Sequence, residues 1–172
     1  MIKWIHFPLN TRVPQIGFEV IKVFEGKFNL IDSSKHQNDS DDVLRILSEA
    51  LEGIGFTVEG DANIKIPVLY GENGKTAKAF EVDAVNFNEK FVIEIEAGRA
   101  FMGNQIYKDL FEVSVLVDIE YLCIAVRQIY EFGKGKNRGK SLDYEKAKTL
   151  FNTLYASNKF NLPIKGILLI GY

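Results

Sequence analysis

FEVDAVNFNEKFVIEIEAGRA, residues 80–100, places acidic side chains at alternate positions of two segments that otherwise have the apolar pattern of core strands. Side chains alternate between the two faces of a strand, so Glu81 and Asp83 share one face of the first segment. Glu94 and Glu96 share one face of the second for the same reason. The opposite faces then carry apolar residues and point toward a layer of helices: Phe80, Val82, Ala84, Ile93, Ile95 and Ala97.

The turn between the two segments decides which acids lie opposite each other. A hairpin with a loop of two or four residues within 87–90 pairs residues whose numbers sum to 177. Asp83 then lies opposite Glu94, and Glu81 lies opposite Glu96. A three-residue loop would place the acids opposite isoleucines and expose apolar side chains on both strands, which hydrophobic patterning disfavours. The sequence therefore predicts one patch of four carboxylates.

Such a patch is unfavourable if nothing balances it. Two carboxylates ~4 Å apart repel by about 4 kcal/mol at an effective dielectric constant near 20. A divalent cation would remove this repulsion, and oxygen ligands suit Mg²⁺, Mn²⁺ or Ca²⁺ rather than zinc. The alternative is a solvated outer face of a hairpin, balanced by nearby lysines at positions 65, 78 and 90.

The rest of the chain predicts an α/β fold with a central mixed β-sheet flanked by helices. The expected elements are helices over 41–54 and 104–117, a helix after residue 141, and strands over 64–70, 78–86, 91–97, 120–126 and the C-terminal nine residues. Residues 14–26 fit a short helix or a strand, 28–34 a strand, and 132–140 a loop. Asp39 or Ser40 can cap the helix over 41–54, Ser141 can cap the helix that follows it, and an Asn-Gly pair predicts a turn after residue 70.

Length and composition fit one domain. The 172 residues are 47% hydrophobic and 26% charged, with a net charge of −2. We expect a single domain over 1–172, with an N-terminal extension over 1–38, a core over 39–130 and a C-terminal helix and strand over 141–172. One cysteine, Cys123, lies in an apolar run, and no stretch approaches the ~20 apolar residues that cross a bilayer. We therefore expect a cytoplasmic protein without a membrane partner.

One pattern in this region resembles the motif of the PD-(D/E)XK nuclease superfamily, which has the restriction-endonuclease-like fold. In this pattern an Asp on one strand is followed, after ten residues, by Glu-x-Glu late in the next strand and then by a helix. The resemblance covers about residues 41–126 in the order αβββαβ. It implies that Asp83 and Glu94 are metal ligands, with the Ile95 carbonyl beside them. Glu96 stands where the family usually has Lys, so this chain would be a variant. Val82 replaces the Pro of the family motif.

The resemblance also implies roles for other residues. Glu96 would orient or deprotonate the attacking water, or bind a second metal. Members of the superfamily often add an acid from the first helix, for which Glu49 is the candidate, and Lys108 from the later helix could replace the missing Lys. The residues expected to contact phosphate or DNA are Arg99, Asn104, Gln105, Lys134, Lys136 and Arg138. Solvated helix faces and a solvated loop are the alternatives for these side chains.

The function expected from the resemblance is a metal-dependent DNA endonuclease that uses Mg²⁺ or Mn²⁺ and is related to restriction enzymes. A domain of this size would choose a DNA sequence only with a partner, as a homodimer or through a separate recognition module. One rival is a non-catalytic module of the same fold that binds nucleic acid or protein. A second rival is an interaction domain whose acidic patch docks a basic partner.

Overall fold

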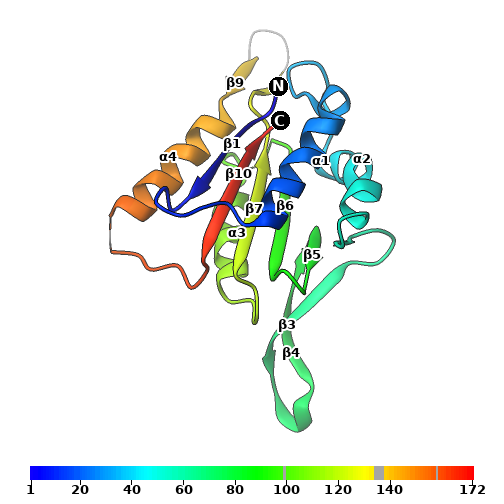
Figure 1. Cartoon of the computed structure of the whole chain (residues 1–172), viewed down its shortest axis with the longest axis vertical. Helices are drawn as coiled ribbons and strands as arrows, with labels where there is room; N and C mark the ends of the chain where they lie inside the picture. Colours follow the sequence, from blue (N-terminus) through cyan, green and yellow to red (C-terminus); the bar gives the residue numbers. More distant parts are fainter. Residues whose placement is uncertain (99, 134–137, 158) are drawn as a thin grey trace.

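The computed structural model of the chain describes residues 1–98, 100–133, 138–157 and 159–172. These residues form an α/β structure with four helices, a central mixed sheet of six strands and two small hairpins (Figure 1). The helices are α1 (Gln15–Ile31), α2 (Ser40–Glu52), α3 (Gln105–Ser114) and α4 (Asp143–Ala156). The strands are β1 (Lys3–Phe7), β2 (Thr57–Val58), β3 (Ile64–Tyr70), β4 (Thr76–Val82), β5 (Ala84–Asn86), β6 (Phe91–Glu96), β7 (Tyr121–Val126), β8 (Tyr130–Phe132), β9 (Gly139–Ser141) and β10 (Gly166–Gly171).

The central sheet has the strand order β1-β10-β7-β6-β5-β2. Strands β6, β7 and β10 run parallel, and β1, β5 and β2 join as antiparallel strands toward the two edges. The strands β7 and β10 read YLCIAV and GILLIG and are buried almost throughout, as expected for parallel strands covered on both faces.

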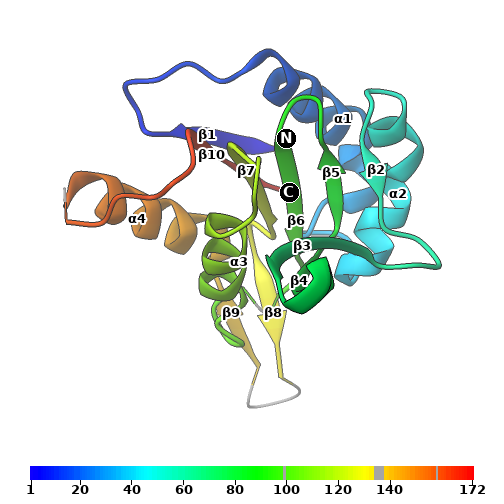
Figure 2. The ribbon, with the colours of Figure 1, turned by 90° about the horizontal axis from the view of Figure 1, so that it is seen from below.

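Helices cover both faces of this sheet. The pair α1 and α2 covers one face, and α3 and α4 cover the other (Figure 2). Along β6 the alternation is regular, because Ile93 and Ile95 pack with the α1–α2 layer and Val92 packs with the α3–α4 layer. The acids Glu94 and Glu96 therefore share the face of Val92. None of the helices in the described residues is both long and apolar enough to cross a membrane.

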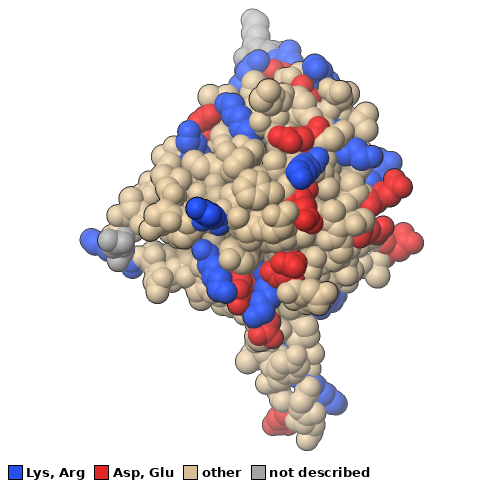
Figure 3. Space-filling view, in the orientation of Figure 1, with Lys and Arg blue, Asp and Glu red and all other residues tan. Residues whose placement is uncertain are grey.

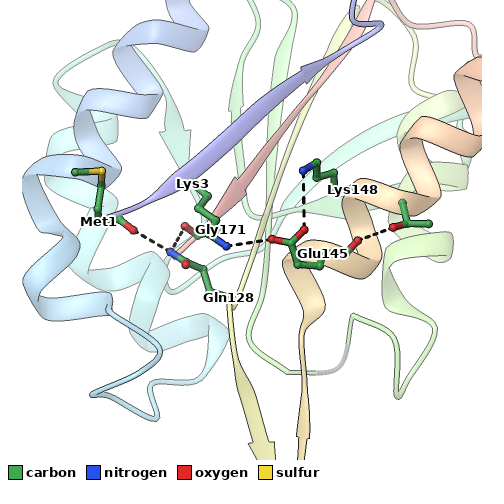
Figure 4. Close-up of polar contacts among 7 residues, drawn as sticks. Met1, Lys3, Gln128, Glu145, Lys148 and Gly171 are labelled. Carbon is green, nitrogen blue, oxygen red and sulfur yellow. Dashed lines mark hydrogen bonds and ion pairs between the residues drawn. The ribbon is translucent and has the colours of Figure 1, made fainter.

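Residues 1–38 differ from the expected extension, because they supply both a strand and a covering helix. Strand β1 pairs with β10 at the edge of the sheet. Gln128 Nε2 donates to the carbonyls of Met1 and Gly171, and Lys3 forms an ion pair with Glu145 of α4 at 3.0 Å (Figure 4). The N-terminal strand is thus held to its neighbours by side chains as well as by the sheet.

Helix α1 is longer than the sequence pattern indicates. The strand expected over 28–34 is wrong, because residues 28–31 form the last turn of α1. Ile31 is buried and continues the apolar stripe of that helix. Helix α2 confirms its expected cap, because the Asp39 carboxylate accepts a hydrogen bond from the Asp42 backbone N–H at 2.8 Å.

The cap expected at Ser141 is wrong. Ser141 ends β9, Leu142 precedes the helix, and the Ser141 hydroxyl donates to the Asp143 carboxylate. The loop expected over 132–140 is in part a hairpin of β8 and β9, of which the structure describes both strands.

Strands β3 and β4 do not join the central sheet, although the sequence allows a meander of three strands. They form a separate antiparallel hairpin that projects from the sheet (Figure 1), which we call the arm. The expected Asn-Gly turn is confirmed at its tip, where Asn73 and Gly74 both have positive φ. The chain breaks regular strand geometry at Asp83, so Val82 packs with the α3–α4 layer and Ala84 with the α1–α2 layer. The expectation that these two side chains share a face is therefore wrong.

Candidate functional site: an acidic cavity beside β6

The hairpin of β5 and β6 has the register expected from the sequence. Ala84 pairs with Ile93, Val85 with Val92 and Asn86 with Phe91, and the loop between the strands comprises residues 87–90. Every pair sums to 177. Asp83 directly precedes Ala84 in the chain, so it lies just beyond the end of this ladder. Its hydrogen bond to Ile95 places it beside the second half of β6.

A cavity of about 210 Å³ lies beside the second half of β6. We call it the acidic cavity, because seven of its twelve lining residues are acids and one is a lysine. It is lined by Ser40, Asp41, Glu59, Glu81, Val82, Asp83, Glu94, Ile95, Glu96, Gln105, Lys108 and Asp109. The acids on these strands therefore line one cavity and are not spread over an outer face of the sheet.

Asp83 is anchored to the neighbouring strand by one strong contact. Its carboxylate Oδ2 accepts a hydrogen bond from the Ile95 backbone N–H at 2.6 Å. This hydrogen bond favours the charged form, but burial outweighs it and raises the pKa of Asp83 to about 7. The nearby charge of Glu59 raises the pKa further. Asp83 is thus a carboxyl group that the fold holds in place without a cationic partner among the described residues.

Glu94 experiences the same environment more strongly. Burial raises its pKa well above the ordinary 4.5, and the charges of Asp83 and Asp109 add to the effect. Lys108 acts in the opposite direction but is the weakest of the contributions. This arrangement favours the neutral form of Glu94, or the ionised form with a cation bound from solution.

Glu96 and Asp109 form a carboxyl pair. Burial raises the pKa of Glu96 first, and the charge of Asp109 and a hydrogen bond between the two groups raise it further. Burial also raises the pKa of Asp109, while the hydrogen bond from Glu96 lowers it. The pKa values of both carboxyl groups are therefore raised, mainly by burial, and the two groups titrate as a pair.

Asp109 is a site residue that the sequence analysis missed. It is 5% exposed, lies on α3, and its Oδ2 has no hydrogen-bond donor among the described residues. The sequence did contain a signal, because Asp109 follows Ile106 by three positions and precedes Val113 by four. It thus occupies the apolar stripe of α3, where an acid needs an explanation.

Glu81 lines the cavity. It does not join the cluster of carboxylates, although the sequence predicts that it does. It lies on the arm, opposite Lys65, and forms an ion pair with that lysine at 3.2 Å. Its expected pairing with Glu96 is wrong, because β4 leaves the central sheet at Asp83 and does not extend the ladder with β6. Glu59, which follows β2, lines the cavity instead, and burial raises its pKa.

Two predicted residues of α3 do line the cavity. Gln105 begins the helix and Lys108 lies one turn later. The Lys108 ammonium group also forms an ion pair with Glu112 at 3.7 Å and remains more than half exposed. Lys108 is therefore at the rim, where it can contact a bound anion as well as Glu112.

The remaining predicted site residues lie elsewhere or outside the described residues. Glu49 is exposed on α2 and does not line the cavity; Asp41, at the start of the same helix, does. Asn104 precedes α3 in a left-handed conformation and is not a lining residue. Arg138 pairs with Glu131 in the β8–β9 hairpin at 2.6 Å. Arg99, Lys134 and Lys136 are not among the described residues.

The acidic cavity has the donors of an oxygen-only metal site but not its final geometry. Within residues 1–98, 100–133, 138–157 and 159–172, no three His, Cys, Asp or Glu side chains stand arranged to hold a metal ion. The oxygen donors that line the cavity are nevertheless mainly carboxylates, and Asp109 contributes a buried oxygen that receives no hydrogen bond in the described residues. Mg²⁺ and Mn²⁺ prefer such oxygen ligands and usually keep several waters. The residues thus fit such an ion in their chemistry, and side-chain rotation would be required to bind it.

A second, larger cavity of about 820 Å³ adjoins the acidic cavity and shares Asp41, Glu59 and Glu81 with it. It lies between the start of α2 and the loop after β2, and most of its charged lining residues are also acids. The negative potential at the site therefore extends outward along this groove, which favours cations over anions.

No model of a known protein family matches this chain, and no curated protein matches it in sequence.

Proposed function

We propose that this chain is a metal-dependent endonuclease that hydrolyses DNA phosphodiester bonds with Mg²⁺ or Mn²⁺. The observation that carries the proposal is the convergence of Asp83, Glu94, Glu96 and Asp109 on one cavity, with a buried Asp109 oxygen that lacks a donor. Structural stability alone gives no reason for this convergence, because burial opposes the charged form of each of the four groups.

The arrangement of the strands supports the fold that the PD-(D/E)XK resemblance implies. The helix α2 precedes the antiparallel pair β5 and β6, and α3 then leads to β7, which runs parallel to β6. This order is that of a restriction-endonuclease-like core in which β3 and β4 have left the sheet as the arm. We propose that the fold is a variant of that class.

Asp83, Glu94 and the Ile95 carbonyl are the residues that would hold the cation, as the resemblance implies, and Asp109 is a further ligand candidate from the structure. When bound, a divalent cation would neutralise the clustered carboxylates and lower the pKa of a bound water. The Ile95 N–H would keep Asp83 oriented throughout, because it donates to one carboxylate oxygen and leaves the other available.

The Glu96–Asp109 pair provides the proton chemistry of the proposed reaction. Glu96 takes the position of the family lysine, and a glutamate there can accept a proton only when it is ionised. When both groups are ionised, the pair could accept one proton from an attacking water and hold it between the Glu96 and Asp109 carboxylates. Lys108 at the rim would stabilise negative charge that develops on the phosphate.

Substrate binding needs basic groups in addition to those in the cavity. On the face drawn in Figure 3, acidic and basic side chains of the described residues are interspersed, so that face presents no broad basic surface to a phosphate backbone. Among the described residues that line the acidic cavity, Lys108 is the basic one. Lys134, Lys136 and Arg138 stay proposed DNA contacts, and the first two lie outside the described residues.

Cleavage of supercoiled plasmid DNA tests this function directly. The wild type should nick or linearise the plasmid with Mg²⁺ or Mn²⁺ and not with EDTA. Asp83→Asn should reduce the rate by at least ~100-fold, because it removes a ligand charge. Asp118→Asn is the matched control, since Asp118 is exposed and lies outside the cavity. Equal cleavage by Asp83→Asn and Asp118→Asn would contradict the proposed site.

A non-catalytic module of the same fold is the second candidate, and one observation favours it. Lys108, the substitute for the missing lysine, is exposed and engaged with Glu112 rather than directed only at the carboxylates. Thermal melts distinguish the two functions, because a ligand that binds only the folded state raises the midpoint. A midpoint raised by Mg²⁺ or Mn²⁺ without plasmid cleavage would favour the module over the nuclease.

A further inference from the structure

Helix α3 has a second apolar face that the described residues leave largely exposed, although the Phe101 ring packs edge-on against Tyr107 at its start. Its inner face buries Ile106, Leu110 and Val113 against the sheet. Its outer face carries Tyr107 and Phe111, which are 46% and 65% exposed, and Val115 directly after the helix is 42% exposed. Residues four apart lie on one side of a helix, so these three side chains form a continuous row that we call the outer stripe.

Two more exposed apolar residues flank the helix in the sequence. Met102 before it and Val117 after it are 60% and 57% exposed. Side chains of these types bury on the order of 100–200 Å² each when fully covered, so the five together expose on the order of 400 Å² of apolar surface. That apolar area is comparable to the largest apolar patch on a typical monomer, which is often functional.

We propose that the outer stripe is the interface of a homodimer, in which α3 of one copy packs antiparallel against α3 of a second copy. The two-fold axis passes near Phe111. An antiparallel pairing centred there places Tyr107 against Val115 of the second copy, and the same contact recurs on the other side of the axis. The stripe is thus complementary to itself, as an isologous interface requires.

The area supports a second copy as the occupant. About 65% of a homodimer interface is apolar, so roughly 400 Å² of apolar surface per copy corresponds to an interface of about 600 Å² per copy. The total of about 1,200 Å² reaches the lower end of specific protein–protein interfaces. The dimer is therefore expected to be modest in affinity and to depend strongly on its central residue.

The charges beside the stripe also favour a second copy over a strongly charged partner. Lys108 and Glu112 lie next to the stripe and form an ion pair at 3.7 Å, so the face carries both signs. Two such faces can meet without like charges opposing each other, whereas nucleic acid or a highly acidic or basic protein would find no field of one sign there.

Dimerisation at this surface would join two acidic cavities. The same helix brings Gln105 and Asp109 to the cavity on its inner side. Pairing of α3 would hold two copies of the cavity in one fixed relation, whatever reaction they support. The proposal does not depend on the proposed nuclease function and is tested without measuring activity.

Light scattering coupled to size-exclusion chromatography tests the interface. At ~100 µM the wild type should have twice the monomer mass of 19.5 kDa. Phe111→Glu should weaken the dimer at least roughly tenfold, as changes at the centre of an interface do. Leu30→Glu on α1 is the matched control, because Leu30 is similarly exposed at 53% on the opposite face of the sheet and should leave the dimer intact. Unchanged circular dichroism of Phe111→Glu excludes unfolding as the cause.

A charge-pair experiment tests the antiparallel register. Tyr107→Glu and Val115→Lys should each weaken the dimer, and the double variant should regain at least part of the lost affinity. Within one copy the two positions are two turns apart and too distant to pair, so recovery requires contact between copies. A monomeric wild type at ~100 µM, a dimer insensitive to Phe111→Glu, or no recovery in the double variant would overturn the proposed interface.

Discussion

Replacing Asp83 by Asn should stabilise the folded protein at alkaline pH when no divalent cation is present. The Asp83 carboxylate has one hydrogen bond, from the Ile95 N–H, and no ion-pair partner in the described residues. Burial raises its pKa from the ordinary 3.8 to about 7. Asn has a similar shape, can still accept the Ile95 hydrogen bond and carries no charge at any pH.

The sign and size of the effect follow from proton binding. Between pH 4 and pH 7 the unfolded chain has lost the Asp83 proton while the folded protein still binds it, so stability falls as the pH rises through this window. The stability associated with the proton is complete below about pH 4 and is lost above about pH 7. A difference of roughly three pKa units corresponds to about 4 kcal/mol, and roughly 2–3 kcal/mol of this loss falls between pH 5 and pH 8.

Thermal melts of the wild type and Asp83→Asn in EDTA, at pH 5 and pH 8, measure this effect. One kcal/mol shifts the midpoint of a chain of this size by roughly 2–4 °C, so the gain from Asp83→Asn should be roughly 4–12 °C larger at pH 8 than at pH 5. Asp118→Asn is the control and should show no such difference. A gain that is equal at both pH values, or a lower midpoint at pH 8, would refute the burial of an uncompensated carboxylate at this position.

Two further predictions concern the framework around the site. Asp39→Ala should destabilise the protein by about 0.5–2 kcal/mol in chemical denaturation, because the Asp42 N–H loses its cap, and an unchanged midpoint would contradict that cap. Gly98→Ala should destabilise by more than about 1 kcal/mol, because φ is +108° there and a Cβ would lie 2.3 Å from the Tyr130 ring. Gly26→Ala, where a Cβ meets nothing within 4 Å on α1, should instead stabilise by about 0.5–1 kcal/mol, and effects of the same sign at both glycines would contradict this account.

The sequence allowed the local features of the site to be predicted. The alternation of side chains placed Glu94 and Glu96 on one face of β6, and hydrophobic patterning selected the register that puts Asp83 beside Glu94. The cap at Asp39 was also predictable, because it depends on residues three positions apart. Each of these features is set by neighbours in one strand, one hairpin or one helical turn, where spacing along the chain determines spacing in space.

The tertiary structure alone decided which distant residues join these acids. Strand β4 leaves the sheet at Asp83, which takes Glu81 to Lys65 and away from Glu96. Helix α3 packs over the same face of the sheet and adds Asp109 to the cavity. The position of Asp109 in the sequence does not indicate that it lies close to β6. The N-terminal strand β1 likewise finds its partner β10 at the far end of the chain. Such choices depend on packing between whole layers, and periodicity within a single segment carries no information about which layer will cover it.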